Sequence, residues 1–250
     1  MSEVKSALRT GDIVNLCDED AAAEILKSSV LGLWEVVNNL TRLRRTKREH
    51  YYVTIFGSAR IQPGTESYAE VKRLAEELTQ MGCRIVTGGG PGLMQAANEG
   101  ATGVCGPDGG CSVGIRVDLP FEQTVNPFVG QVFQHRTFFS RLHQFVLMSE
   151  AFVVVPGGIG TVLELAMVWQ LLQVRKLYGT PLVLLGPMWQ GLVEWTRQHM
   201  LVPGSEMVSP PDLEIPQCVN TVDEAIGIVR KDHQEWIAAQ AAAATASACP

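Results

Sequence analysis

The feature that most constrains the fold is a regular alternation, from Tyr51 onward, of short apolar runs with longer segments of helical periodicity. The β-branched and aromatic run Tyr51–Phe56 is followed by residues 66–81, in which apolar residues recur at helical spacing. Further strands are predicted at 83–87, 111–117, 131–133, 151–155 and 181–185, and helices at 93–101, 137–149, 161–174, 189–200 and 223–230. Such alternation indicates βαβ units. We therefore expect an α/β, Rossmann-like fold with a mainly parallel sheet flanked by helices on both faces.

Three of the predicted strands end in glycine-rich turns, at residues 57–60, 88–92 and 156–161. Ligands of open parallel sheets bind beyond the carboxyl ends of the strands. Glycine lets the backbone approach a ligand closely, and the first N–H groups of a following helix favour an anion. The combination predicts a site for a phosphate-bearing ligand, with purely structural turns as the alternative.

Other common signatures are missing from the sequence. It contains neither the Gly-x-Gly-x-x-Gly fingerprint after the first strand nor the Walker pattern, which argues against a standard dinucleotide fold and against ATP hydrolysis. The five histidines have no metal-ligand spacing, and no Gly-x-Ser-x-Gly elbow supports a hydrolase triad. Asp118 follows the third predicted strand and is a candidate site acid, although a solvated loop residue is the reading we favour.

Glu164 is the most informative single residue, because no other charged side chain occurs in residues 151–174. A carboxylate on so apolar a helix is costly to bury without a partner. The alternative is that Thr161 and Glu164 form a capping box at the start of the helix. The glycine turn just upstream favours a functional role, because it places the carboxylate about one helical turn, roughly 5 Å, from a bound phosphate sugar.

Arg141 is the second candidate, because it shares the apolar side of its predicted helix with Phe138, Phe145 and Met148. This spacing places a guanidinium on the side of the helix that faces the core. The alternatives to a functional role are a side chain that snorkels to solvent and a buried pair with an acid. The spacing does not decide among these three possibilities.

Composition excludes several classes of protein. Apolar residues make up 46% of the chain and charged residues 18%, which excludes a wholly disordered chain. The net charge of −6, from 20 basic and 26 acidic residues, does not suggest a nucleic-acid partner. The six cysteines are scattered without a Cys-x-x-Cys pair, so we expect reduced thiols in a cytoplasmic protein. No signal peptide is visible, and Pro156 with two glycines interrupts the most apolar window, so no membrane segment is expected.

The chain is expected to divide into three parts: an N-terminal helical extension at 1–50, a nucleotide-binding catalytic domain at 51–232, and a flexible alanine-rich tail at 233–250. The extension is predicted to be helical over about 20–49 and ends in a basic run at 42–48. That run is either an anion-binding patch or, as we favour, a solvated helix end. Residues 103–110 are expected to form a mobile loop.

Two of these segments resemble a known family. Residues 88–94, Gly-Gly-Gly-Pro-Gly-Leu-Met, and residues 156–164, Pro-Gly-Gly-Ile-Gly-Thr-Val-Leu-Glu, are similar to the signature motifs of the LONELY GUY (LOG) family. Its members are cytokinin riboside 5′-monophosphate phosphoribohydrolases, often labelled lysine decarboxylases. The resemblance runs from about Tyr51 to Arg230. It implies a nucleoside 5′-monophosphate N-glycosidase, a homodimer or larger homo-oligomer without a metal or redox cofactor, and adenine bases, cytokinins included, as substrates.

The resemblance also assigns roles to residues. The family's catalytic glutamate and arginine fall on Glu164 and Arg141, and Leu142 stands where the family usually has lysine. Phosphate and ribose binding is expected at Gly157, Gly158, Gly160 and Thr161. Secondary substrate-binding candidates in the glycine turns are Ser58, Gly89, Gly90 and Met94.

Two other functions remain open at this point. The same superfamily includes carriers, which would hold a phosphorylated ligand such as molybdenum cofactor without cleaving it. A nucleotide-sensing regulator would use the N-terminal helix or the alanine-rich tail to contact its partner. Lysine decarboxylation is disfavoured because that chemistry needs a Schiff-base lysine, and none of the six lysines lies in a glycine turn or beside Glu164.

Overall fold

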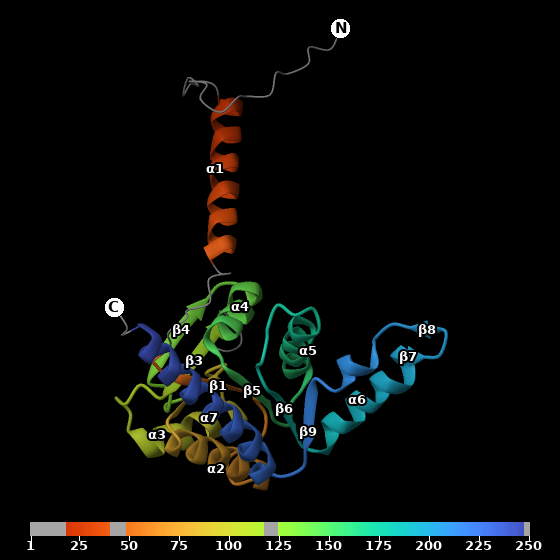
Figure 1. The fold of residues 1–250 in the computed structure, drawn as a ribbon. Helices are drawn as coiled ribbons and strands as arrows, with labels where there is room; N and C mark the ends of the chain where they lie inside the picture. Colours follow the sequence, from red (N-terminus) through yellow and green to blue (C-terminus); the bar gives the residue numbers. More distant parts are fainter. Residues whose placement is uncertain (1–18, 41–48, 118–124, 248–250) are drawn as a thin grey trace. The chain divides into compact units, whose positions relative to one another are not determined.

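The computed structural model describes residues 19–40, 49–117 and 125–247 of the chain. Within these ranges the centre is a seven-stranded sheet, parallel at every pairing, in the order β4-β3-β2-β1-β5-β6-β9 (Figure 1). The strands are β1 (Tyr51–Phe56), β2 (Cys83–Thr87), β3 (Ser112–Val117), β4 (Gln131–His135), β5 (Ala151–Val154), β6 (Leu182–Leu185) and β9 (Pro216–Val219). The predicted α/β, Rossmann-like fold is confirmed.

The order in which the strands join the sheet creates a place for a ligand. From β1 the chain adds β2, β3 and β4 on one side, then returns to pair β5 with the other side of β1. β1 and β5 end together, with Phe56 opposite Val154, so their following turns leave the sheet side by side. Open parallel sheets bind ligands at such a topological switch point. Both turns belong to the glycine-rich turns in which the sequence predicts a ligand site.

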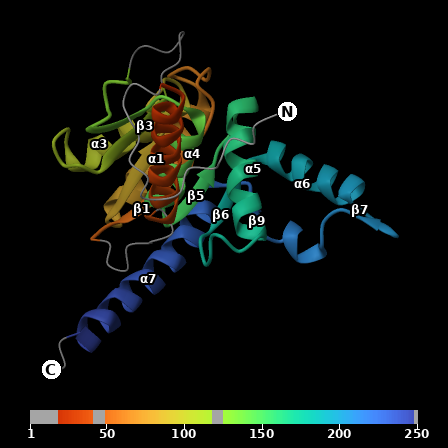
Figure 2. The same ribbon diagram turned by 90° about the horizontal axis from the view of Figure 1, so that it is seen from above.

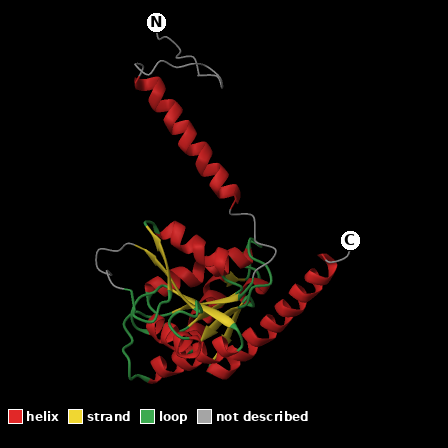
Figure 3. Cartoon of the chain, turned by 90° about the vertical axis from the view of Figure 1, so that its left-hand side faces the viewer, coloured by secondary structure: helices red, strands yellow, loops and turns green. Residues whose placement is uncertain are grey.

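Helices cover both faces of the sheet, as the red helices around the yellow strands show (Figure 3). One face carries α2 (Glu66–Gln80), α3 (Leu93–Cys105) and α7 (Val222–Ser247), and the other carries α4 (Phe138–Met148), α5 (Ile159–Gln173) and α6 (Pro187–Met200). Val53 and Ile55 of β1 belong to the first core, and Phe152 and Val154 of β5 to the second. The strands are apolar on both sides because both sides are covered.

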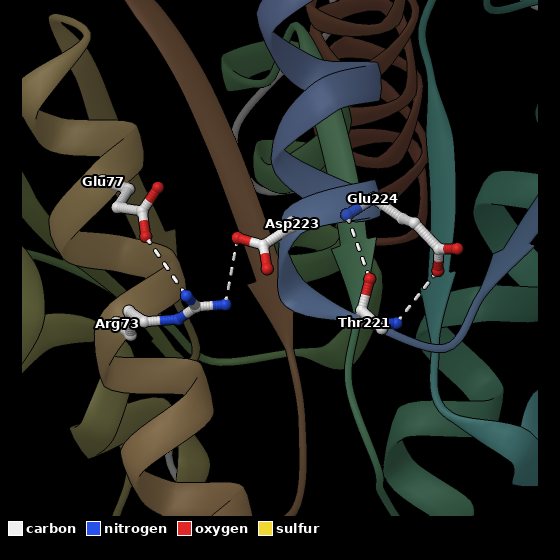
Figure 4. A network of polar contacts seen from close by, with 5 residues as sticks. All are labelled: Arg73, Glu77, Thr221, Asp223 and Glu224. Carbon is white, nitrogen blue, oxygen red and sulfur yellow. Dashed lines mark hydrogen bonds and ion pairs between the residues drawn. The ribbon is translucent and has the colours of Figure 1, made fainter.

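Exposed polar contacts cap the start of α7 and join it to α2 (Figure 4). The backbone N–H of Glu224 donates to Oγ1 of Thr221 at 3.2 Å, and the N–H of Thr221 donates to the Glu224 carboxylate at 3.0 Å. This reciprocal arrangement is a capping box, which defines where the helix begins. Arg73 of α2 reaches Asp223 at 3.2 Å and Glu77 at 3.7 Å. Exposed pairs of this kind stabilise only weakly, so they orient α7 more than they hold it.

The last helix is much longer than the sequence suggests. The periodicity predicts residues 223–230, whereas α7 continues to Ser247, through most of the segment expected to be a flexible tail (Figure 2). His233 is buried and forms a cluster of three rings with Tyr51 and Trp236, whose centroids lie 4.8 Å and 6.0 Å from its own and 5.6 Å from each other. The Tyr51 hydroxyl donates to Asp232. Burial lowers the pKa of His233, so the imidazole is neutral at neutral pH. The packing of α7 on the sheet therefore extends beyond residue 232.

Two further expectations differ from the structure, and several short elements were not predicted. α3 continues to Cys105, so the predicted loop at 103–110 is helical in its first part. Cys105 and Cys111 form a disulfide, so the prediction of reduced thiols is wrong for this pair, whereas Cys83 and Cys218 are free. β9 was not predicted, because a four-residue edge strand that begins with proline gives little periodic signal. Neither was the segment before it: β7 (Leu201–Val202), β8 (Ser205–Glu206) and the short 3-10 helix η1 (Pro210–Leu213).

The contacts between residues divide the chain into two compact units, residues 1–46 and 47–250. The first unit contains the helix α1 (Glu19–Leu40). The basic run at 42–48 and the candidate acid Asp118 lie outside the described residues. In the part of the chain that the structure describes, no helix is both long and apolar enough to cross a bilayer.

Candidate active site

A cavity of about 540 Å³ lies at the carboxyl ends of β1, β2, β3 and β5. The turns after β1 and β2, the end of β3, and the first turns of α4 and α5 form its walls. It is lined by Gly57, Ser58, Ala59, Arg60, Gly88, Met94, Arg116, Val117, Phe138, Arg141, Gly158, Ile159, Gly160, Thr161 and Glu164. The fold therefore brings together seven of the ten predicted site residues, and Gly89, Gly90 and Gly157 do not line the cavity.

The N-terminus of α5 is open toward this cavity. Gly158 is the N-cap and supplies no side-chain cap, and the first intrahelical bond runs from the N–H of Val162 to the Gly158 carbonyl at 3.0 Å. The earlier N–H groups of the helix have no intrahelical acceptor. A Cβ added at Gly158 or Gly160 would meet no atom within 4 Å, whereas one at Gly157 would lie 2.2 Å from Oγ1 of Thr161. Gly157 is thus required by the turn, and the other two leave room for a ligand.

The same geometry excludes the capping-box reading of Glu164. A capping box needs Thr161 at the N-cap, but the helix begins two residues earlier, so Thr161 is its third residue and Glu164 its sixth. Glu164 instead pairs with Arg141, whose Nη1 lies 2.9 Å from the carboxylate Oε1. The Glu164 side chain is only 10% exposed and the Arg141 side chain 13%. Burial of either charge alone would be strongly unfavourable, so each depends on the other.

Arg141 is held on several sides. Its Nε donates to the carbonyl of Ile115 at 3.0 Å, and its guanidinium carbon lies 5.1 Å from the centre of the Phe145 ring. A Cβ at Gly88 would lie 2.5 Å from its Nη2. The snorkelling alternative is therefore wrong, and the buried pair with an acid is present. The acid is Glu164, the other predicted catalytic residue.

A buried polar network shapes the turn after β2. The N–H of Gly89 donates to Oγ1 of Thr87 at 2.9 Å, and Asn126 donates from its backbone to the Gly89 carbonyl and from its side chain to the Gly90 carbonyl. Asn98, fully buried on α3, accepts from both Thr87 and Asn126. Gly89 and Gly90 thus belong to the framework of the cavity. Sequence reasoning missed the two asparagines, because a lone polar residue in a helix or loop carries no signal of burial.

Two lining arginines were also missed. Arg60 follows directly on the first glycine turn, and Arg116 lies near the end of β3. With Arg141, the described lining has three guanidinium groups and one carboxylate, an excess of positive charge that suits an anionic ligand. Burial, and then the charge of Arg141, lower the pKa of nearby His135. Its imidazole is consequently neutral at neutral pH and adds no further charge.

A second cavity, of about 630 Å³, lies near the amino-terminal end of β6. Thr180 and Pro181, which precede β6, line it together with residues of α7 such as Lys231 and Asp232. The described residues that line it include no glycine-rich strand end and no helix N-terminus, which are the features that bind phosphate in such folds. Among the described residues, no cluster of three His, Cys, Asp or Glu side chains could hold a metal ion.

The sequence profile of the protein family described as "Possible lysine decarboxylase" matches residues 94–229, more than half of the chain. The chain belongs to this family. The matched segment includes Arg141 and Glu164, and the resemblance seen in the sequence is confirmed at this level. No curated protein sequence gives a significant match.

Solved structures share the fold at low identity. The molybdenum cofactor carrier protein of Chlamydomonas reinhardtii has a TM-score of 0.54 and 19% identity, over 74% of this chain and 99% of that chain. The molybdenum cofactor binding protein of Rippkaea orientalis has a TM-score of 0.54 and 16% identity, over 74% and 98%. DNA processing protein A of Helicobacter pylori has a TM-score of 0.50 and 17% identity, over 73% and 81%. At such identities the likeness establishes the fold alone.

The contact between Gly88 and Arg141 leads to a first prediction. In Gly88→Ala the new methyl group displaces the Arg141 guanidinium and weakens its pairing with Glu164, so we expect the free energy of unfolding to fall by about 1–3 kcal/mol. Urea denaturation measures the change. Gly227→Ala in α7, where a Cβ meets no atom within 4 Å, is the matched control and should lose no stability. Equal stability of the two variants would contradict the proposed packing.

Proposed function

We propose that this protein hydrolyses the N-glycosidic bond of nucleoside 5′-monophosphates, releasing the free base and ribose 5-phosphate. The observation that carries the proposal is the buried pair of Arg141 and Glu164 on the cavity wall, less than two helical turns beyond the open N-terminus of α5. One end of the cavity suits a phosphate and the adjacent wall offers a carboxylate. Family membership and the LOG-like motifs support the same reading.

The phosphate would bind at the start of α5. The N–H groups of Ile159, Gly160 and Thr161 face this end of the helix, where the helix dipole favours negative charge. Arg60 lies close by, because the N–H of Ser58 donates to the carbonyl of Pro156 at 3.0 Å and ties the turn after β1 to the turn after β5. A guanidinium adds a second, charge-assisted set of donors for phosphate oxygens.

Glu164 would act on the glycosidic carbon. Cleavage of the bond between C1′ and the base develops positive charge at C1′, as in other glycoside hydrolyses. The Glu164 carboxylate stabilises that charge and orients a water molecule, whose oxygen bonds to C1′. The electron pair of the broken bond leaves with the base, and the proton lost by the water ends on the base. Fixing the phosphate first holds the ribose against the carboxylate.

Arg141 would position Glu164 and supply positive charge. Its Nη1 fixes one carboxylate oxygen, and the contacts of its Nε and ring-facing surface leave it little freedom. In that place it neutralises part of the substrate's negative charge or polarises the departing base. Leu142, where the family usually has lysine, does not line the cavity.

The homodimer implied by the resemblance is part of the proposal. Phe139 and Ile159, at the starts of α4 and α5 beside the cavity, are each 85% exposed. Leu163, one turn further along α5, is 47% exposed. Large apolar side chains gathered next to a ligand site are typical of a surface that a second chain covers.

The first test is catalytic. Wild-type protein should release base from nucleoside 5′-monophosphates, and Glu164→Gln should slow the release by about 100-fold or more while remaining folded. Chromatography of the products measures it. Glu194→Gln, at an exposed position on α6, is the matched control and should keep full activity. Folded wild-type protein that releases no base, yet retains a phosphorylated ligand, would contradict hydrolysis and favour a carrier.

The second test concerns the phosphate subsite. Gly160→Ala adds a methyl group where the protein has open space, so stability should be unchanged or slightly higher. The same methyl group intrudes on the helix N-terminus, so we expect ribose 5-phosphate to bind about tenfold more weakly in calorimetry. Gly191→Ala in α6 also has open space and serves as the control. Unchanged affinity in Gly160→Ala would place the phosphate elsewhere.

A further inference from the structure

Arg116 lies at the end of the cavity opposite the start of α5. The cavity crosses the carboxyl ends of four neighbouring strands, in the order β5-β1-β2-β3. Neighbouring strands are about 4.8 Å apart, so the ends of β5 and β3 are separated by roughly 14 Å. That span matches a mononucleotide from its phosphate to the far edge of its base. A phosphate at α5 therefore directs the base toward Arg116.

The turn after β2 makes room for this side chain. A Cβ at Gly89, which has φ +71°, would lie 3.2 Å from Cγ of Arg116, just as a Cβ at Gly88 would strike Nη2 of Arg141. Two consecutive glycines thus accommodate two arginines. The Arg116 side chain is half-buried against this turn, and its position at the cavity wall is set by the backbone beneath it.

The surroundings fit a flat aromatic base. Met94, Val117 and Phe138 line the cavity together with Arg116 and provide apolar contact for the faces of a ring. Among the lining residues that the structure describes at this end, the polar side chain is the Arg116 guanidinium, and we assign it to the edge of the base. Guanidinium groups offer hydrogen-bond donors and no acceptor.

Donors at this position discriminate between bases. Guanine, hypoxanthine and xanthine present O6 and N7, two adjacent acceptors that a guanidinium binds with two hydrogen bonds. Adenine presents an amino group at the same place, so a donor would face a donor. An N6-substituted cytokinin base has the same mismatch and a bulky group in addition.

We propose that Arg116 makes this a site for 6-oxopurine nucleoside 5′-monophosphates in preference to adenine nucleotides. The inference rests on the proposed function, because it takes the phosphate of the substrate to lie at the start of α5. It departs from the adenine and cytokinin substrates that the family resemblance implies. Arg116 selects the base, and Glu164 with Arg141 acts on the bond to it.

The test measures binding apart from turnover. In the slow Glu164→Gln background, calorimetry compares GMP, IMP and AMP, with ribose 5-phosphate as a ligand that has no base. We expect GMP and IMP to bind about tenfold or more tightly than AMP. Adding Arg116→Gln should abolish or reverse this preference, because an amide pairs with adenine, while ribose 5-phosphate affinity stays the same.

A matched variant separates recognition from general charge. Lys176→Gln also removes one positive charge, at an exposed position outside the cavity lining, and should keep the preference for GMP. Equal or tighter binding of AMP, in a protein that still releases base from AMP, would overturn this inference and leave the proposed function standing. If GMP binds more tightly than AMP but the wild type releases no base, the proposed function is overturned and the inference about Arg116 stands. Loss of ribose 5-phosphate binding in the Arg116 variant would show the opposite orientation and overturn the inference.

Discussion

The ion pair between Arg141 and Glu164 sets the requirements that the surrounding structure meets. It joins α4 to α5 with two side chains that are about nine-tenths buried. A buried charge that loses its partner costs several kcal/mol, so both helices must deliver their residues to the same point. The carbonyl of Ile115 takes the remaining Nε donor of the arginine. Gly88 has no side chain because the guanidinium occupies the space where one would lie.

The sheet topology gives this pair its chemical setting. α5 follows β5, which pairs with β1 at the switch point, so the paired carboxylate lies near a helix N-terminus and two glycine turns. Together with Arg60 and Arg116 the arrangement favours an anionic ligand that spans the strand ends. The described lining includes no lysine, although the family description names a lysine decarboxylase and pyridoxal-dependent decarboxylation requires one. The site suits hydrolysis of a phosphorylated nucleoside better than the chemistry in that description.

Much of the fold could be predicted from sequence because its signals are local. Alternating apolar runs located six of the seven strands of the main sheet, and caps such as Thr65 and Thr137 mark where helices begin. β9 was missed because it is short, lies at an edge and begins with proline. The predicted end of α7 was too early because an alanine-rich segment shows no apolar periodicity. Alanine is nevertheless the strongest helix former, and the buried His233 anchors the part of the helix before this segment.

The site was predictable only where a residue is unusual for its own segment. Glu164 stands out as a lone charge on an apolar helix, and Arg141 as a guanidinium on an apolar face. Their pairing, and the choice between a capping box and an ion pair, depend on where α5 begins, which spacing alone does not determine. Arg60, Arg116, Asn98 and Asn126 look like ordinary polar residues in the sequence. Their roles arise from contacts between segments far apart in the chain.

The central claim is that a mononucleotide lies across the strand ends, with its phosphate at the start of α5 and its C1′ beside Glu164. A crystal structure of Glu164→Gln soaked with GMP tests it most directly. We expect phosphate oxygens within hydrogen-bond distance of the N–H groups of Gly160 and Thr161, and C1′ in contact with the side chain at position 164. Phosphate bound at Arg116 with the base at α5, or the nucleotide in the cavity beside α7, would contradict the account.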